Sequence, residues 1–163
     1  MTSPTTTQKP APTDPAGITA AVTALTTALV EIDASHRRIR HRLAHDLGFS
    51  TGELTAIYLV GTTENCTPKH LSGELDLSTG AITAMVDRLE KSGHLERRVH
   101  PTDRRSQLLA VTTAGRETND AILGLYNSAI EDVVKNSPCV FDAGLIDCLR
   151  HAATAIDTAA TAA

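Results

Sequence analysis

Hydroxyl and guanidinium side chains gather between residues 78 and 105 of this sequence. They are Ser78, Thr79, Thr83, Arg88, Arg97, Arg104 and Arg105. Such groups donate many of the hydrogen bonds that proteins make to the phosphate oxygens and base edges of DNA. Any one of these arginines alone is more simply explained as a solvated surface charge. Their joint placement indicates a nucleic-acid-binding segment.

The helix that must position the first of these side chains begins after Ser78 and ends near Gly93. Its apolar residues recur at the i, i+3, i+4, i+7 spacing of one helix face. They are Ile82, Met85, Val86 and Leu89. Ser78 can cap the N-terminus, and Gly93 can adopt the left-handed conformation that ends a helix. The opposite face is small or hydroxyl-bearing apart from Asp87 and Arg88, so a flat surface such as DNA can approach it closely.

The segments on both sides of this helix complete a known motif. Thr67-Pro68 opens a short helix through Leu75, and residues 76 and 77 form a tight connection. Two helices joined in this way form a helix-turn-helix, whose second helix enters the major groove of DNA. Residues 95–99 and 108–111 indicate strands, and Asp103 favours a turn between them from which Arg104 and Arg105 project. The pattern predicts a winged helix-turn-helix.

Histidines offer a second kind of chemistry. His41 and His45 lie one helical turn apart and form a possible metal-ligand pair, and with His36 they suggest a small metal-dependent enzyme as the alternative function. No Cys, Asp or Glu nearby repeats the pattern, and the arginines among these histidines oppose a cation. An enzyme also leaves the hairpin with Arg104 and Arg105 unexplained. We therefore expect no catalytic residue, no bound metal and no cofactor.

The cysteines argue against a disulfide framework, because Cys66, Cys139 and Cys148 are odd in number and no export signal precedes them. Cys66 adjoins a helix start, which could lower the pKa of its thiol. An inert loop cysteine is the simpler interpretation, and an oxidant-sensing regulator is the alternative.

Long amphipathic helices flank the predicted winged helix. The first carries an apolar stripe of Ile18, Val22, Leu25, Leu29, Ile32, Ile39, Leu43 and Leu47. His36 falls in this stripe, where a core histidine is the simpler interpretation and a ligand contact the alternative. Ser50 and Glu53 form a capping box that starts a helix through residue 62. Thr112 caps another long helix, and a last one begins near Phe141.

Composition bounds these interpretations. A chain of 163 residues has single-domain length, and its net charge of −4 means that DNA affinity must come from a local patch. Residues 1–16 are rich in Thr, Pro and Ala and predict a disordered arm. We find neither a secretory signal nor the run of roughly 18 apolar residues that a membrane span needs. We therefore expect a cytoplasmic protein with no membrane partner.

Four segments together resemble the MarR family of bacterial transcription regulators. They are Leu-Asp-Leu-Ser-Thr-Gly-Ala-Ile-Thr at 75–83, Val-Asp-Arg-Leu-Glu-Lys-Ser-Gly at 86–93, Asp-Arg-Arg at 103–105 and Val-Thr-Thr-Ala-Gly at 111–115. Two departures are Val111, where the family usually has Leu, and Gly80, where larger residues are common. The resemblance implies a mainly α fold with a small two- or three-stranded β-wing.

The same resemblance implies a domain order and a set of partners. Residues 17–47 and 114–163 would be dimerisation helices, and residues 48–113 the DNA-binding lobe. The implied protein is a homodimeric repressor, released from a palindromic operator in double-stranded DNA by a small molecule. The effector would contact His36, Arg40 and Tyr58, and Asp103 would orient Arg105 toward the minor groove. A metal- or oxidant-sensing regulator of the same fold remains the alternative.

Overall fold

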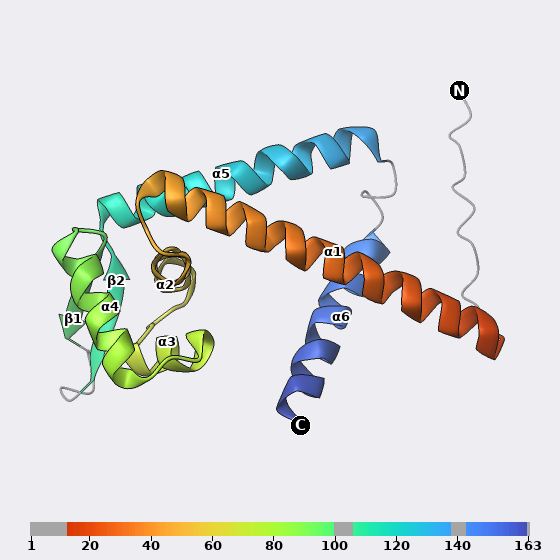
Figure 1. Ribbon diagram of the computed structural model, residues 1–163, viewed down its shortest axis with the longest axis horizontal. Coiled ribbons are helices and arrows are strands. Elements are labelled where there is room, and N and C mark those ends of the chain that lie inside the picture. Colours follow the sequence, from red (N-terminus) through yellow and green to blue (C-terminus); the bar gives the residue numbers. More distant parts are fainter. Residues whose placement is uncertain (1–12, 100–105, 138–142, 163) are drawn as a thin grey trace. The chain divides into compact units, whose positions relative to one another are not determined.

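The computed structural model describes residues 13–99, 106–137 and 143–162, which form six helices and one antiparallel pair of strands (Figure 1). The elements are α1 (Pro15–Leu47), α2 (Thr51–Thr62), α3 (Pro68–Leu75), α4 (Thr79–Lys91), β1 (Leu95–Val99), β2 (Gln107–Val111), α5 (Thr113–Asn136) and α6 (Ala143–Thr161). The predicted fold class, mainly helical with a small β-wing, is confirmed.

The first compact unit of the chain ends at Leu54 and is dominated by α1. The helix begins at Pro15, inside the segment predicted to be an arm, because the side chain of Asp14 accepts a hydrogen bond from the amide of Gly17 at 2.9 Å. Asp before Pro is a helix-start signal that the sequence analysis missed. The helix ends at Gly48, whose φ of +76° suits a residue without a Cβ.

Threonine hydroxyls in α1 are turned back onto their own helix. Thr19 donates to the carbonyl of Pro15 at 2.9 Å, and Thr23 donates to that of Thr19 at 3.0 Å. Thr154 and Thr158 do the same in α6, at 3.1 and 2.8 Å. The polarity of these hydroxyls is therefore partly satisfied within the helix.

Helix α1 also contains an 18-residue window with a mean hydropathy of 1.4, none of which is buried. Among the described residues, α1 alone is long and apolar enough to cross a membrane by length and composition. Threonines and other polar residues interrupt the apolar residues of α1, so a search for an unbroken apolar run does not find this window. The same length and apolarity suit a helix that packs along another protein chain.

The second compact unit, from Thr55 onward, contains the main core of the chain. In it, α4 packs against α3 and β1, while β2 contacts α3 and α5 (Figure 1). The apolar residues buried there are Ala56, Ile57, Val60, Cys66, Leu71, Ile82, Met85, Val86, Leu89, Leu95, Leu109 and Ile122. Strands β1 and β2 pair from Leu95 opposite Val111 to Val99 opposite Gln107.

Candidate nucleic-acid interface

The turn between α3 and α4 is built from local hydrogen bonds. Asp76 ends α3 in the left-handed conformation, with φ 50° and ψ 44°. The amide of Leu77 then donates to the carbonyl of Ser72 at 3.2 Å, and the Ser72 hydroxyl donates to the carbonyl of Leu77 at 2.6 Å. Ser78 caps α4 by accepting from the amide of Ala81 at 3.3 Å. Two short helices are thus held at a fixed turn, as the sequence predicted.

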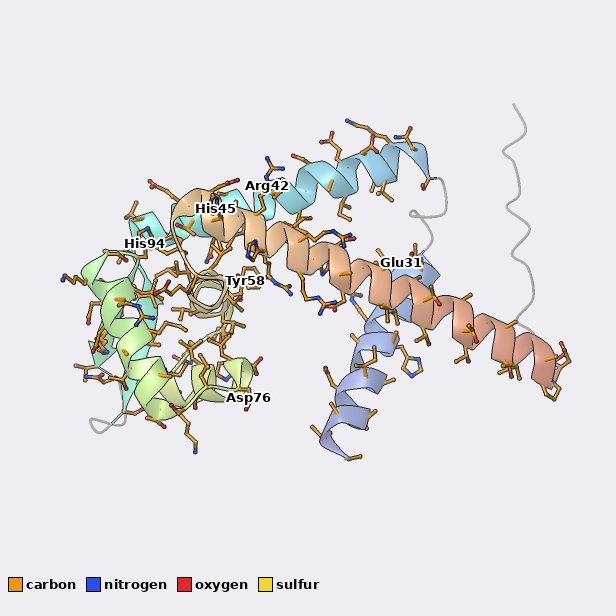
Figure 2. All side chains as sticks on the ribbon, viewed as in Figure 1. Glu31, Arg42, His45, Tyr58, Asp76 and His94 are labelled. Atoms are coloured by element: carbon orange, nitrogen blue, oxygen red, sulfur yellow. The ribbon has the colours of Figure 1, made fainter. Side chains whose placement is uncertain are left out.

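Helix α4 has one buried face and one exposed face. The predicted core residues Ile82, Met85, Val86 and Leu89 are all buried, with at most 6% of their surface exposed. The exposed residues include Ser78, Thr79, Gly80, Thr83, Asp87 and Arg88. A Cβ added at Gly80 would meet nothing within 4 Å, so this face is open at the first turn. Asp76 and His94, labelled in Figure 2, lie in the connections before and after α4.

The hydroxyl groups on the exposed face already take part in helix bonding. Ser78 uses its oxygen as the cap acceptor, and Thr83 donates to the carbonyl of Thr79 at 2.9 Å. The Ser78 O–H can still donate to an approaching phosphate, whereas Thr83 presents its methyl group and an oxygen that can only accept. This is a surface for close contact.

Arg97, a predicted DNA contact on β1, is occupied by two carboxylates of α4. Its Nη2 lies 2.5 Å from Asp87 Oδ1, and its Nη1 pairs with Glu90 Oε2. Partial burial acts to lower the pKa of the Arg97 guanidinium, but the hydrogen bond to Asp87 and the charges of Glu90 and Asp87 outweigh it and raise that pKa. Only 22% of the Arg97 side chain is exposed. The neighbouring Arg98 pairs with Glu96 at 2.5 Å.

The predicted wing tip lies outside the described residues. This applies to Asp103, which was expected to orient the wing, and to Arg104 and Arg105, which were expected to contact DNA. Val99 and Gln107 form the last described pair on the tip side of the hairpin. The roles of these three tip residues stay predictions.

The predicted effector residues come from different parts of the chain. His36 is exposed on α1 rather than buried in a core, and Arg40 on the same helix is half-buried. Tyr58, on α2 in the second compact unit, is 36% exposed. The effector site therefore stays a prediction. In the described part of the chain, no group of three or more His, Cys, Asp or Glu residues could hold a metal ion.

Cys66 differs from the reactive cysteine that the sequence left open. Its side chain is 1% exposed, and burial, with a smaller effect from Glu74, raises the pKa of its thiol. A buried thiol with a raised pKa is a poor nucleophile and a poor oxidant sensor. The burial of Cys66 therefore favours the inert interpretation.

A cavity of about 310 Å³ opens beside β2. It is lined by Val60, Asn65, Arg98, Leu108, Leu109, Ala110, Val111 and Arg116. Arg98 pairs with Glu96, and Arg116 donates to the Val111 carbonyl and the Thr113 hydroxyl at 3.1 and 3.0 Å. Both arginines are thus bound to nearby protein groups.

The junction that fixes the wing to α5 was not predicted from the sequence. The Thr112 hydroxyl donates to the Gly93 carbonyl at 2.6 Å and accepts from the Gly115 amide at 3.2 Å. A Cβ at Gly115 would lie 2.2 Å from the His94 carbonyl oxygen, so only glycine permits this approach. The 111–115 segment contains the signal, since a helix cap followed by glycine inside the first helical turn is unusual.

A second missed contact joins α5 to α2. Asn119 is 8% exposed and donates from Nδ2 to the carbonyl of Ile57 at 3.3 Å. A Cβ at Gly61 would lie 1.9 Å from that nitrogen. A buried amide facing a helical glycine gives no sequence signal of its own, because the two residues are far apart in the chain.

Comparison with known proteins places this geometry in context. Residues 49–107 match the MarR family model. An uncharacterized HTH-type transcriptional regulator of Bacillus subtilis strain 168, YcgE, is 35% identical over 74 residues, which are 45% of this chain and 48% of that protein. The chain spans 48% and 62% of the lengths of two curated relatives that it matches.

Solved structures share the fold. The structure of RV1404 from Mycobacterium tuberculosis matches 82% of this chain and 92% of its own, with 24% identity and a TM-score of 0.65. FabT of Streptococcus pneumoniae, solved in complex with DNA, matches 89% of this chain and 96% of its own, with 21% identity and a TM-score of 0.56. At these identities the likeness concerns the winged-helix fold.

Proposed function

We propose that this chain, whose residues 49–107 form a MarR-family domain, is a dimeric transcriptional regulator that binds double-stranded DNA through α4. The observation that carries the proposal is the exposed face of α4. It is open at Gly80, bears hydroxyl groups and Arg88, and follows a tight turn from α3. A second helix presented in this way fits the major groove. FabT, which has the same fold, was solved with DNA.

Arg88 is the side chain that we propose for reading a base or holding a phosphate on the exposed face of α4. If it reads guanine, Arg88→Ala should cost about 1 to 3 kcal/mol of binding free energy and relax preference at one position of each half-site. If it holds a phosphate, binding should weaken equally on every sequence. Fluorescence anisotropy with DNA from the promoter of its own gene, and with single-base variants, measures both. Wild-type protein without affinity for any tested duplex, at low salt, would contradict the proposed function.

The wing supplies the second proposed contact. Arg104 and Arg105 would neutralise phosphates, each contributing roughly −0.9 to the slope of log affinity against log salt. Arg105→Ala should therefore weaken binding and flatten the salt dependence with little change in melting temperature. Asp103→Ala should also weaken binding, although it removes a charge that repels DNA. Tighter binding by that variant would show that Asp103 has no orienting role.

Dimerisation is supported by apolar residues that a single chain leaves exposed. Val22 and Val30 on α1, Ile130 on α5 and Ile156 on α6 are each at least 55% exposed. A second copy of the chain would cover them, and its α4 would meet a half-site roughly 34 to 36 Å away on a near-palindrome. Light scattering should show a dimer at micromolar concentration. A stable monomer that binds the operator at full strength would refute this arrangement.

We further propose that the protein is a cytoplasmic repressor, not an enzyme, released from DNA by a small molecule. A tenfold loss of DNA affinity requires the ligand to prefer the non-binding conformation by about 1.4 kcal/mol. We expect His36→Leu to keep DNA binding while losing the release of DNA by the ligand. Arg40→Ala and Tyr58→Phe should weaken that release. Screening aromatic and anionic compounds for release of the bound duplex tests this, and an unaltered response in all three variants would remove these residues from the site.

A further inference from the structure

Arg97 joins the wing to α4 through a bridge of charges. Its two terminal nitrogens engage Asp87 and Glu90, which lie one turn apart on α4. The Arg97 amide also points to Glu90, with 3.4 Å between the nitrogen and Oε1. Within the β1–β2 pair, Arg97 is the register partner of Leu109, which is 4% exposed. A single residue of β1 thus meets two side chains of α4 and pairs with the one buried residue of β2.

We propose that Arg97 is a positioning residue that sets the rotation of α4 about its own axis, and that it does not contact DNA. This inference rests on the proposed function of α4. A planar guanidinium offers donors in a rigid fork, so its pairing with two carboxylates fixes direction as well as distance. Two attachment points on one helix turn add a directional constraint on the outward face of α4, beside the buried residues that turn its other face inward. Arg88, adjacent to Asp87, is aimed by the same constraint.

Charge arithmetic favours this role over a phosphate contact. Asp87 and Glu90 together carry −2 on the proposed groove helix, and Arg97 reduces the cluster to −1. A phosphate approaching Arg97 would therefore compete with the two carboxylates that already hold the guanidinium. The carboxylates are 60% and 42% exposed, so these pairs lie partly in water and contribute little to folding stability. Their effect should appear in the orientation of α4.

The decisive variant is Asp87→Ala/Glu90→Ala, which releases Arg97 while removing two negative charges. A positioning role predicts that operator affinity falls about tenfold, because the base-reading side chains lose their alignment. The slope of log affinity against log salt should not steepen. If Arg97 were a phosphate contact held back by the acids, the same variant would bind every duplex more tightly and steepen that slope by about 0.9. Tighter binding therefore overturns the proposal.

Glu96→Ala is the matched control, because it frees the neighbouring Arg98 from its acid without touching α4. It should leave operator affinity unchanged or raise it. Arg97→Lys is the second variant, since it keeps the charge but loses the fork. It should reproduce the loss of operator affinity. Wild-type operator affinity in Arg97→Lys would also overturn the proposal.

Hydrogen exchange without DNA separates this inference from the proposed function. In Asp87→Ala/Glu90→Ala, amides of β1 and of the C-terminal half of α4 should exchange several-fold faster, while those of α3 stay as in wild type. Unchanged exchange in β1 and α4 refutes the positioning role, even if a separate assay shows that the wild-type protein binds DNA. Faster exchange in a protein whose wild type binds no duplex supports the bridge and refutes the DNA-binding function.

Discussion

Apolar residues are mostly buried in the winged helix but mostly exposed on the long helices α1, α5 and α6, which we call the helical arms. Leu71, Ile82, Leu89 and Leu95, from the winged helix, are at most 1% exposed. By contrast, Val30 on α1 is 60% exposed. Burial of apolar surface contributes about 25 cal/mol per Å², so the winged helix is stabilised within one chain and the arms are not. The exposed apolar residues of these helices are those that the proposed dimer would cover.

The two cysteines within the described residues should give the largest contrast. Cys66 is buried at the start of α3 and Cys148 is exposed on α6. In a Cys139→Ser background, Cys148 should react with a thiol reagent at the rate of a free peptide. Cys66 should react only after the lobe opens, which can cost up to the whole unfolding free energy of about 5–15 kcal/mol. Labelling followed by mass spectrometry measures both rates, and equal rates would show that the lobe is not closed.

The same thiol gives the lobe a pH dependence with a defined sign. Burial raises the pKa of Cys66, so the unfolded chain releases this proton at lower pH than the folded protein does. Stability from this group is complete below the ordinary thiol pKa and is lost as pH rises through the raised value. Cys66→Ala should lessen that alkaline loss.

The next largest contrast is expected in unfolding free energy, between a truncation in the winged helix and one in the helical arms. Leu89→Ala removes a side chain that is 1% exposed and should cost about 2–5 kcal/mol of unfolding free energy. Ile130→Ala, at a position 55% exposed, should cost the isolated chain less than about 0.5 kcal/mol but weaken the dimer. Denaturant unfolding at two protein concentrations separates these terms. If both variants lost the same unfolding free energy at high dilution, the winged helix and the arms would not differ in how one chain stabilises them.

Two glycines of α5 test how far along this helix the tight packing against the winged helix extends. Gly115→Ala would press a Cβ against the His94 carbonyl and should cost about 1–3 kcal/mol. Gly124→Ala meets nothing within 4 Å and should instead stabilise the helix by up to about 1 kcal/mol. Thermal melting of both variants measures the difference. A neutral Gly115→Ala would mean that the approach of α5 to the wing is not tight.

The smallest effect is expected from an ion pair in the arms. Lys135 lies 2.6 Å from Glu131 on α5, and their side chains are 66% and 62% exposed. Glu131→Gln should change the unfolding free energy by about 0.3–0.5 kcal/mol, less at high salt. Melting at two salt concentrations measures this. A loss above 1 kcal/mol would show that charge pairs stabilise the arms.

Much of the lobe was predictable because its signals are local. Thr67, Ser78 and Thr112 cap the helices that follow them, as their residue types and positions predicted. The burial of Ile82, Val86 and their neighbours also follows from helical spacing alone. These features depend on residues within one or two turns of one another, so a single sequence contains them.

The rest depends on contacts between distant segments. Arg97 was expected on the DNA surface, but the pairing of β1 with α4 places it beside Asp87 and Glu90. Cys66 adjoins a helix start, yet its carbonyl accepts from the Leu109 amide at 2.8 Å and its side chain is buried. Charge and hydroxyl content identified the exposed face of α4, whereas only the tertiary structure shows that Arg97 is held by carboxylates of that helix.

The threonines that bond back into α1 and α6 set how near another helix can come. With their hydroxyls turned onto their own carbonyls, Thr19, Thr23 and Thr154 present mainly a methyl group to a facing helix. Helix axes in proteins lie about 8–10 Å apart, and the smallest side chains permit the shortest separation. A face of α1 or α6 that carries alanine and such threonines can therefore pack at the narrow end of this range, whereas a face that carries Val22 or Ile156 holds two axes farther apart.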